Sequence, residues 1–553
     1  MTNTVAAISK PLPRLRQPLE DLLLLLAVTL GLRLLAYHGM FGTDDLVYYS
    51  RALDVAFGTW SSSEYNGALR YAFNIPAGFL ARWLGQSPDV VMIWPLACSL
   101  VEVAAVYVLA STFMNRRAGI VAAALLATAP LHVSVATRLH TDPILAMFIT
   151  LAFALLWFGW RWRSSAAMFG FGVAVGAIFW TKEMALIFWL AYVPMLWLFR
   201  DRWWDLLPAV AGGALMLVLH LVLMTYVAGD PLHVFRLLAN IDSAYRGGPL
   251  QVEDAPGYYI KYLLFDLRHV GLLSLLGLGA LLILVPQQRS GAFDRAGLLF
   301  VVVWWLGLFL ILSILPVSLS PLRFVMKQSN YISIFLAPLA ILGGMAIAQL
   351  PRWIGNGALA AALMIGVTLS LLQQADWRAF SANTKALAAW AVENPDSLVV
   401  GSVNNADFGN SWLRIRYPGQ SHATIMAFGD IRADPTRFAP LAAAAGVVTV
   451  AFDAENIHWG KRRVAMAAPL PCWGPPVATL TPVGLSLGNR FAGALAVVAG
   501  LVAETTGAAP ARAAAQLLAT EAKPKPLQLF TLNGPDVFCE HTRQSTPIRE
   551  PVR

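Results

Sequence analysis

Apolar runs of about 20 residues, separated by short polar segments, fill the first two thirds of the chain. These runs predict about eleven membrane-spanning helices. They lie at residues 20–38, 89–113, 117–135, 143–160, 166–180, 183–199, 206–226, 269–286, 297–315, 329–349 and 355–373. The pattern is typical of a polytopic α-helical membrane protein, with a transmembrane domain over residues 1–376.

The pattern changes after residue 376. Strand-like apolar runs alternate with turn residues and Ala-rich helical stretches; the runs are SLVVGSV (397–403), GVVTVAF (446–452) and PLQLFTL (526–532). They predict a soluble α/β domain over residues 377–553, which is large enough to hold its own core. The apolar run at 491–504 is too short to cross a membrane, so we expect a buried helix there.

Composition agrees with a membrane protein. Of the 553 residues, 58% are hydrophobic and only 13% are charged, a balance that excludes an ordinary soluble protein. The net charge of +9 does not indicate a nucleic-acid partner. In a membrane protein, the positions of Lys and Arg in the loops indicate how the chain is oriented in the membrane.

Arginines gather in every second connection between the spans. They are Arg116 and Arg117, Arg161 and Arg163, Arg200 and Arg202, Arg289 and Arg295, and Arg352, and the N-terminus is also basic. Basic loops stay in the cytoplasm, so an odd number of spans places residues 377–553 on the periplasmic side of a bacterial inner membrane. An oxidising compartment there permits a disulfide between Cys472 and Cys539, whose pairing the sequence leaves open.

The first exterior loop, residues 39–88, begins with two adjacent carboxylates, Asp44 and Asp45. The segment FGTDDLVYYSRALDVAF (41–57) has apolar positions at helical spacing, which predicts a helix on the membrane surface. Thr43 or Asp44 is expected to cap its N-terminus. A cap accounts for one of the two acids and not for the second.

Further ionisable residues lie at the exterior ends of the spans. Arg70 belongs to a second interfacial helix, GALRYAFNIPAGFLARWLG (67–85), which we expect to be interrupted near Pro76. The turn TRLHTDP (137–143) contains Arg138, His140 and Asp142.

Two more cationic segments are unusual. Lys182 and Glu183 form a turn between arms of only about 15 apolar residues, or roughly 22 Å of α-helix, so the turn is expected to be recessed below the membrane surface. Arg323 and Lys327 are expected one helical turn apart, on the side where basic residues are disfavoured, which indicates an anionic partner.

In these residues the chain resembles the GT-C superfamily of polyprenyl-phosphate-sugar glycosyltransferases, especially its protein O-mannosyltransferase and lipid A aminoarabinose transferase branch. The similar features are the acidic pair Asp44–Asp45 followed by Tyr48, and the segments HTDP, WTKE and RFVMKQSNYISIFLAPLAILGG. The family's YFxKPP segment corresponds to YAFNIPA, where Asn74 replaces the lysine and Arg70 is the candidate substitute. The resemblance covers about residues 15–375 and depends on the order and sidedness of the motifs.

The resemblance implies transfer of a sugar from a polyprenyl-phosphate donor to a hydroxyl of an exterior acceptor: a glycolipid such as lipid A, a polysaccharide or a protein. Asp44 is the expected general base, and Asp45 orients it or binds acceptor or metal. The candidates for binding the donor phosphate or sugar are Tyr48, Arg70, Arg138, His140, Asp142, Lys182, Glu183, Arg323 and Lys327. The cofactor is left open; a divalent metal would have Asp44, Asp45, His140 and Asp142 as candidate ligands.

Two other classes of protein compete with the enzyme. A transporter or a flippase for lipid-linked sugars would need polar groups near the membrane midplane or repeated halves, and the chain offers chiefly Glu102 and His220 there. We expect both to be hydrogen-bonded bundle residues. A non-catalytic scaffold in envelope assembly would leave the exterior acid and base groups without a use.

Overall fold

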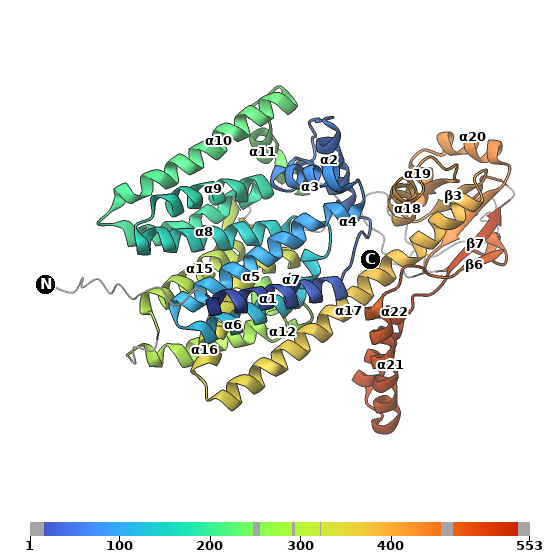
Figure 1. The fold of residues 1–553 in the computed structure, drawn as a ribbon. Coiled ribbons are helices and arrows are strands. Elements are labelled where there is room, and N and C mark those ends of the chain that lie inside the picture. Colours follow the sequence, from blue (N-terminus) through green and yellow to red (C-terminus); the bar gives the residue numbers. More distant parts are fainter. Residues whose placement is uncertain are drawn as a thin grey trace.

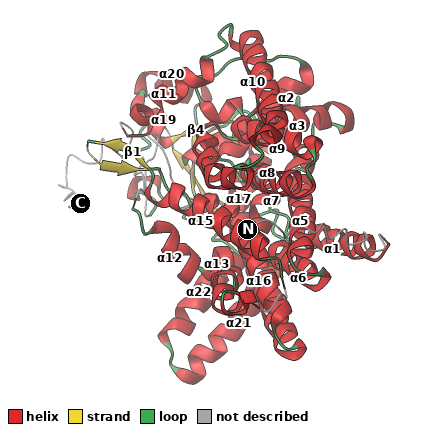
Figure 2. Ribbon diagram, turned by 90° about the vertical axis from the view of Figure 1, so that its left-hand side faces the viewer, coloured by secondary structure: helices red, strands yellow, loops and turns green. Residues whose placement is uncertain are grey.

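A helical bundle and a sheet-containing domain are joined by one long helix in the computed structural model (Figure 1). The structure describes residues 16–246, 255–289, 293–320, 322–454, 468–532 and 534–539. We call the end of the bundle that faces the C-terminal domain the domain end. Figure 2 shows how strongly helices dominate the chain.

Helix occupies each of the eleven predicted spans. The elements are α1 (Arg16–Leu35), α5 (Ile93–Phe113), α6 (Arg116–Thr128) with α7 (Pro130–Ala136), α8 (Asp142–Trp162), α9 (Ser165–Thr181), η2 (Glu183–Phe199), α10 (Leu207–Ala228), α14 (Leu273–Leu284), α15 (Arg295–Ile314), α16 (Ser333–Gln349) and α17 (Arg352–Glu393). By length and composition, seven helices in the described part could cross a membrane, or eight if the bent pair α6–α7 is one span. The prediction of a polytopic helical membrane protein is confirmed.

Two of these spans are irregular. The chain bends by 62° between α6 and α7, where Pro130 lacks the N–H that would continue the helix. The arm after Lys182 is a 3₁₀-helix of 17 residues, so at about 2.0 Å per residue it extends for about 34 Å instead of the roughly 22 Å expected for a short α-helix.

Short elements cover the domain end of the bundle. They are α2 (Asp44–Phe57), η1 (Asn66–Leu69), α3 (Tyr71–Leu84), α4 (Pro88–Val91), α11 (His233–Arg246), α12 (Tyr258–Phe265), α13 (Leu267–Val270), the hairpin β1 (Pro316–Leu319) and β2 (Leu322–Phe324), and η5 (Ser329–Ile332). Two expectations fail here. Helix α3 continues through Pro76. Arg323 lies in strand β2, so it is not one helical turn from Lys327.

The C-terminal domain holds a five-stranded mixed sheet in the order β4-β3-β5-β7-β6. The three predicted strands are β3 (Leu398–Gly401), β5 (Val448–Phe452) and β7 (Leu527–Leu532), and β4 (Thr424–Ala427) and β6 (Ala478–Leu480) complete the sheet. Strand β3 pairs in parallel with β4 and β5, whereas β7 is antiparallel to β5 and β6. The helices are α18 (Val403–Arg416), α19 (Phe428–Ala433), α20 (Pro435–Ala445), α21 (Leu487–Thr506) and α22 (Ala509–Ala522). Cys472 and Cys539 form a disulfide.

Helix α17 links bundle and domain. Its 42 residues extend for about 63 Å, so the predicted domain boundary at residue 377 falls inside one continuous helix. Gln374 and Arg378 on this helix donate hydrogen bonds to the carbonyl oxygen of Tyr37, at 2.9 Å and at 3.1 Å and 3.2 Å. The domain is therefore tied directly to the segment that follows α1.

The polar residues predicted near the membrane midplane have different surroundings. Glu102 lies 3.2 Å from the Nε2 atom of His132 and accepts a hydrogen bond from Thr150 at 3.1 Å, as expected for a bundle residue. Neither ring nitrogen of His220 has a hydrogen-bond partner among the described residues, and its ring packs against Phe179 and Phe235 instead. The expectation for His220 is therefore wrong.

Candidate active site

A cavity of about 870 Å³ lies at the domain end of the bundle. Its lining combines the first loop, the α7–α8 turn, the Lys182 turn, the β1–β2 hairpin and the middle of α17. Five cations line it (Arg70, Arg138, Lys182, Arg268 and Arg323), together with three carboxylates (Asp44, Glu183 and Asp376). Because the cations outnumber the carboxylates, the cavity suits an anionic ligand. We call it the first cavity.

The two adjacent aspartates have separate surroundings. Asp45 is fully buried, and its carboxylate accepts hydrogen bonds from the backbone N–H groups of Phe41 at 2.8 Å, Gly42 at 3.2 Å and Thr43. Burial raises the pKa of Asp45, and these donors oppose the rise. Asp44 is exposed, lines the first cavity and accepts a hydrogen bond from Tyr65 at 3.1 Å.

The predicted cap of α2 by the side chain of Thr43 or Asp44 is wrong. The helix begins at Asp44, and the side chain of Thr43 makes no capping hydrogen bond. The Asp45 carboxylate instead folds back and accepts hydrogen bonds from the backbone N–H groups of Phe41, Gly42 and Thr43. The second acid, which the sequence left without a structural role, therefore holds the turn, and the first acid is open to a ligand.

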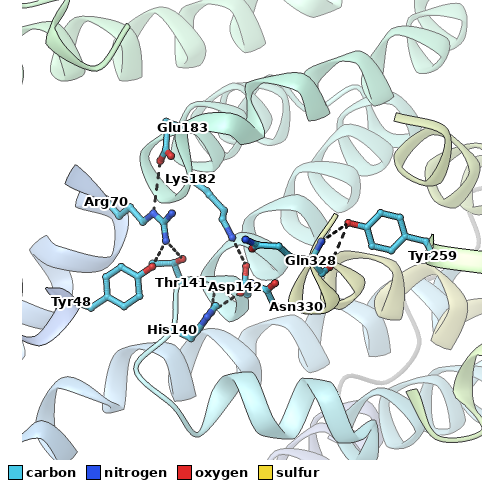
Figure 3. Close-up of polar contacts among 10 residues, drawn as sticks. All are labelled: Tyr48, Arg70, His140, Thr141, Asp142, Lys182, Glu183, Tyr259, Gln328 and Asn330. Carbon is cyan, nitrogen blue, oxygen red and sulfur yellow. Dashed lines mark hydrogen bonds and ion pairs between the residues drawn. The ribbon is translucent and has the colours of Figure 1, made fainter. Parts of the chain in front are cut away.

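Arg70 is held at the end of η1 by polar contacts from three segments (Figure 3). Its guanidinium donates to the hydroxyl of Tyr48 and to Thr141 at 3.2 Å, and it lies 3.8 Å from Glu183. Tyr48 is fully buried, and burial raises its pKa well above the usual value. Arg70 is thus a rigid cation, and its direction is fixed by the fold.

Asp142 and Lys182 form an ion pair beneath the cavity (Figure 3). The Lys182 Nζ atom lies 3.0 Å from Asp142, whose carboxylate also lies 2.5 Å from the Nδ1 atom of His140 and accepts a hydrogen bond from Asn330 at 2.6 Å. Lys182 also sits 4.2 Å from the centre of the Tyr331 ring. Asp142 is fully buried and does not line the cavity, so it positions Lys182 and His140, which do.

The opposite wall comes partly from the long helix α17. Arg138 lies over the rings of Trp377 and Phe41, at 4.5 Å and 5.5 Å from their centres. Burial lowers the pKa of Arg138 to about 10. Arg268 lies 3.0 Å from both Asp376 and Glu521 of α22. The C-terminal domain therefore helps to fix the wall of a cavity in the bundle.

A second cavity, of about 960 Å³, lies between α2 and α18. Its polar lining residues are Thr43, Asp44, Asp407, Asn410, Ser411, Arg414 and His422, and its apolar ones are Leu46, Val47 and Ala406. Thr43 and Asp44 are the two residues that line both cavities. Gly42 also lines this cavity and has a φ of +98°, and a β-carbon there would lie 2.4 Å from that of Phe408. The first loop and α18 are therefore in close contact behind Asp44.

The candidate residues divide into those that line the first cavity and those that do not. Asp44, Tyr48, Arg70, Arg138, His140, Lys182, Glu183 and Arg323 line it. Asp45, Asp142 and Lys327 do not; Lys327 is buried and donates to the carbonyl oxygen of Val325 at 2.8 Å. In the described part of the chain, no three His, Cys, Asp or Glu residues form a group that could hold a metal ion.

Several lining residues were missed in the sequence. Tyr65, Asn330, Tyr331, Asp376 and Trp377 all line the first cavity. Asn330 and Tyr331 stand within the segment that resembles the family, three and four residues after Lys327. Asp376 and Trp377 fall at the predicted domain boundary, where nothing in the pattern indicates a ligand site.

Comparisons with known proteins show which family and which fold this chain resembles. Residues 77–226 match the profile of the dolichyl-phosphate-mannose-protein mannosyltransferase family. The fold resembles ArnT from Cupriavidus metallidurans bound to undecaprenyl phosphate, with a TM-score of 0.53 and 16% identity over 85% of this chain and 96% of that one. The chain has the GT-C fold. The resemblance seen in the sequence is confirmed, and the family match supports the predicted class of enzyme, a glycosyltransferase.

Two further structures are similar to this GT-C chain. Apo ArnT from the same organism has a TM-score of 0.53 and 15% identity, over 79% of this chain and 93% of that one. The oligosaccharyltransferase AglB from Archaeoglobus fulgidus has a TM-score of 0.49 and 14% identity, over 80% of this chain and 70% of that one. No curated protein matches the chain in sequence.

Proposed function

We propose that this GT-C protein transfers a sugar from a polyprenyl-phosphate donor to a hydroxyl of an acceptor outside the cytoplasm. The observation that carries the proposal is the position of Asp44, which borders a cation-rich cavity on one side and a polar cavity on the other. A group that removes a proton from the acceptor while the donor reacts must reach both substrates.

The first cavity suits the phosphate end of the donor. Arg70, Lys182 and Arg323 reach it from three separate elements, and such cations stabilise the charge that develops on a departing phosphate. Arg138 and Arg268 add positive charge on the opposite wall. The similar ArnT structure contains undecaprenyl phosphate, which supports a lipid-linked donor of this class.

The chemistry assigned to the site is a single displacement. The Asp44 carboxylate takes the proton of the acceptor hydroxyl as its oxygen attacks the anomeric carbon of the donor. The new glycosidic bond forms as the bond to the phosphate oxygen breaks, and polyprenyl phosphate leaves with the electron pair. Attack opposite the leaving group inverts the anomeric centre. Asp45 positions Asp44 by holding the turn, and Asp142 positions Lys182.

The second cavity suits the carbohydrate part of an acceptor. Its side chains provide carboxylate, amide, hydroxyl, guanidinium and imidazole groups, which pair with sugar hydroxyls. A glycolipid headgroup or a polysaccharide fits this chemistry better than an apolar peptide. The first loop and α18 together would hold the acceptor against Asp44.

The orientation is part of the same proposal. The basic connections at the end of the bundle remote from the domain support a cytoplasmic N-terminus, and the disulfide in the C-terminal domain suits the periplasm. The membrane is proposed to be a bacterial inner membrane.

The test uses purified protein and a panel of polyprenyl-phosphate sugars, with release of polyprenyl phosphate as the readout. Wild-type protein is expected to consume one of these donors, and the Asp44→Asn variant is expected to lose that activity. If the lipid-linked sugar moves across the bilayer of liposomes and no polyprenyl phosphate is released, the protein is a flippase instead. Full turnover by Asp44→Asn would remove Asp44 as the base.

A further inference from the structure

Helices α21 and α22 form a hairpin that projects sideways from the base of the C-terminal domain (Figures 1 and 2). In Figure 1, α21 runs across the direction of the bundle helices and away from the sheet. The prediction of a buried helix in residues 491–504 is wrong, because only Gly488, Asn489, Ala492 and Ala503 of α21 are buried. We call this hairpin the lateral arm.

The outer face of the lateral arm is apolar and exposed. Val497, Val498, Leu501 and Val502 are 64%, 56%, 56% and 45% exposed. Helix α21 carries just two charged residues, Arg490 near its start and Glu504 near its end. By length and composition alone, α21 is apolar enough to cross a membrane. Such a face is unfavourable in water and indicates a contact that the isolated chain does not make.

Hydrogen bonds fix the height of the lateral arm relative to the bundle. The Gly488 N–H donates to Gln374 at 3.0 Å, and the side chain of Asn489 donates to the carbonyl oxygen of Ala375 at 2.8 Å. Both acceptors follow directly after the apolar stretch of α17 that was predicted to end at residue 373. The base of the arm is therefore level with the point where α17 leaves the apolar layer.

A second connection ties the arm to the apolar rim of the bundle. Glu521 of α22 pairs with Arg268 of α13 at 3.0 Å, and α13 follows α12 in the chain. Helix α12 exposes Ile260 and Phe265, which are 47% and 77% exposed. The arm is thus fixed to a part of the bundle that also exposes apolar side chains.

We propose that the lateral arm lies flat on the membrane that the bundle spans, with the outer face of α21 in the boundary between lipid headgroups and acyl chains. The orientation of α21 does not suit crossing, because a helix of 20 residues that runs across the direction of the bundle extends along the membrane surface for about 30 Å. Arg490 and Arg512 are exposed and can reach lipid phosphates from either helix. This inference is independent of the catalytic proposal.

The experiment uses the full chain reconstituted in phosphatidylcholine–phosphatidylglycerol vesicles, with Cys98→Ala as background. An environment-sensitive fluorophore is attached after Leu501→Cys or, as a matched control, after Leu441→Cys on α20, an apolar residue that is 41% exposed on the domain. We expect the label at position 501 to shift to the blue, to lose emission with brominated acyl chains and to resist aqueous iodide. The label at position 441 should show the reverse.

Two outcomes would overturn the proposal. Equal access of iodide to both labels would mean that the arm stands in water. Protection of position 501 from both iodide and brominated lipid would mean that another protein surface, such as a second copy of the chain, covers the arm. Donor turnover measured on the same samples keeps this result separate from any failure of the catalytic proposal.

Discussion

Asp44 and Asp45 are neighbours in the chain, yet only the Asp44 carboxylate faces the two cavities, whereas the Asp45 carboxylate is buried against the backbone N–H groups of Phe41, Gly42 and Thr43. The reason is geometric: successive residues of a helix point about 100° apart, so a tight turn before α2 can use the second acid and leave the first exposed. The pair therefore separates into a chemical group and a structural one.

This separation predicts opposite phenotypes for the two acids. Asp44→Asn should lower sugar transfer by about 10²–10⁴-fold, the usual contribution of a general base, and leave the melting temperature unchanged. Asp45→Ala should leave buried N–H donors unpaired and cost about 1–3 kcal/mol for each one left unsatisfied. Polyprenyl phosphate release and thermal unfolding measure the two effects. Equal melting temperatures for both variants would contradict the structural role of Asp45.

Arg323 offers a test of donor binding that does not depend on stability. It is exposed on strand β2 and lines the first cavity, so Arg323→Gln should raise the KM for the donor about tenfold or more, since a charged hydrogen bond contributes about 1.5–3 kcal/mol. Arg352→Gln, an exposed arginine at the start of α17 and remote from the cavity, is the control. Equal KM values for the two variants would remove Arg323 from the donor site.

Gly42 tests the contact between the first loop and α18. A β-carbon at this position would collide with Phe408 and Asn404, so Gly42→Ala should destabilise the protein by about 1–3 kcal/mol or more. Gly58→Ala is the matched control, because Gly58 also has a positive φ, +75°, but no atom within 4 Å of the added carbon. Similar unfolding temperatures for the two variants would show that backbone strain alone matters.

Glu521 gives the lateral arm a pH dependence. Burial raises the pKa of Glu521 to about 7, despite Arg268 at 3.0 Å. An acid whose pKa is raised in the folded state binds its proton more tightly there than in the unfolded chain. The contribution of Glu521 to the free energy of unfolding is therefore greatest below its unfolded pKa, near 4.5, and is lost as the pH rises through about 7. Glu521→Gln should flatten the pH dependence of the free energy of unfolding between about pH 4.5 and pH 7. An unchanged slope would contradict the shift.

The disulfide between Cys472 and Cys539 is expected to stabilise the C-terminal domain. Cys472 and Cys539 are 67 residues apart, and a loop of that length corresponds to about 4 kcal/mol in the chain-entropy treatment. Replacing both cysteines with serine should therefore increase proteolysis within the domain. The helices of the bundle should keep their protection, and equal loss in both parts would show that they unfold together.

The sequence by itself determined the features whose causes are local or come from the surrounding solvent. A span must hide its backbone polar groups in lipid, so the apolar runs located all eleven helical segments, and apolar alternation located β3, β5 and β7. The same reasoning found the acidic pair and most of the cations around the first cavity, because charges at the ends of apolar runs are conspicuous.

Only the tertiary structure decided which side chains meet. Asp142 and Lys182 lie 40 residues apart in the chain, and their 3.0 Å contact depends on the packing of α8 beside α9. The second cavity exists because α18 packs on the first loop at Gly42, and Arg323 lies in a strand because β1 supplies its hydrogen-bonding partner. The exposure of α21 followed the same rule: an apolar helix is buried only where another surface covers it, and hydropathy along the chain contains no information about that cover.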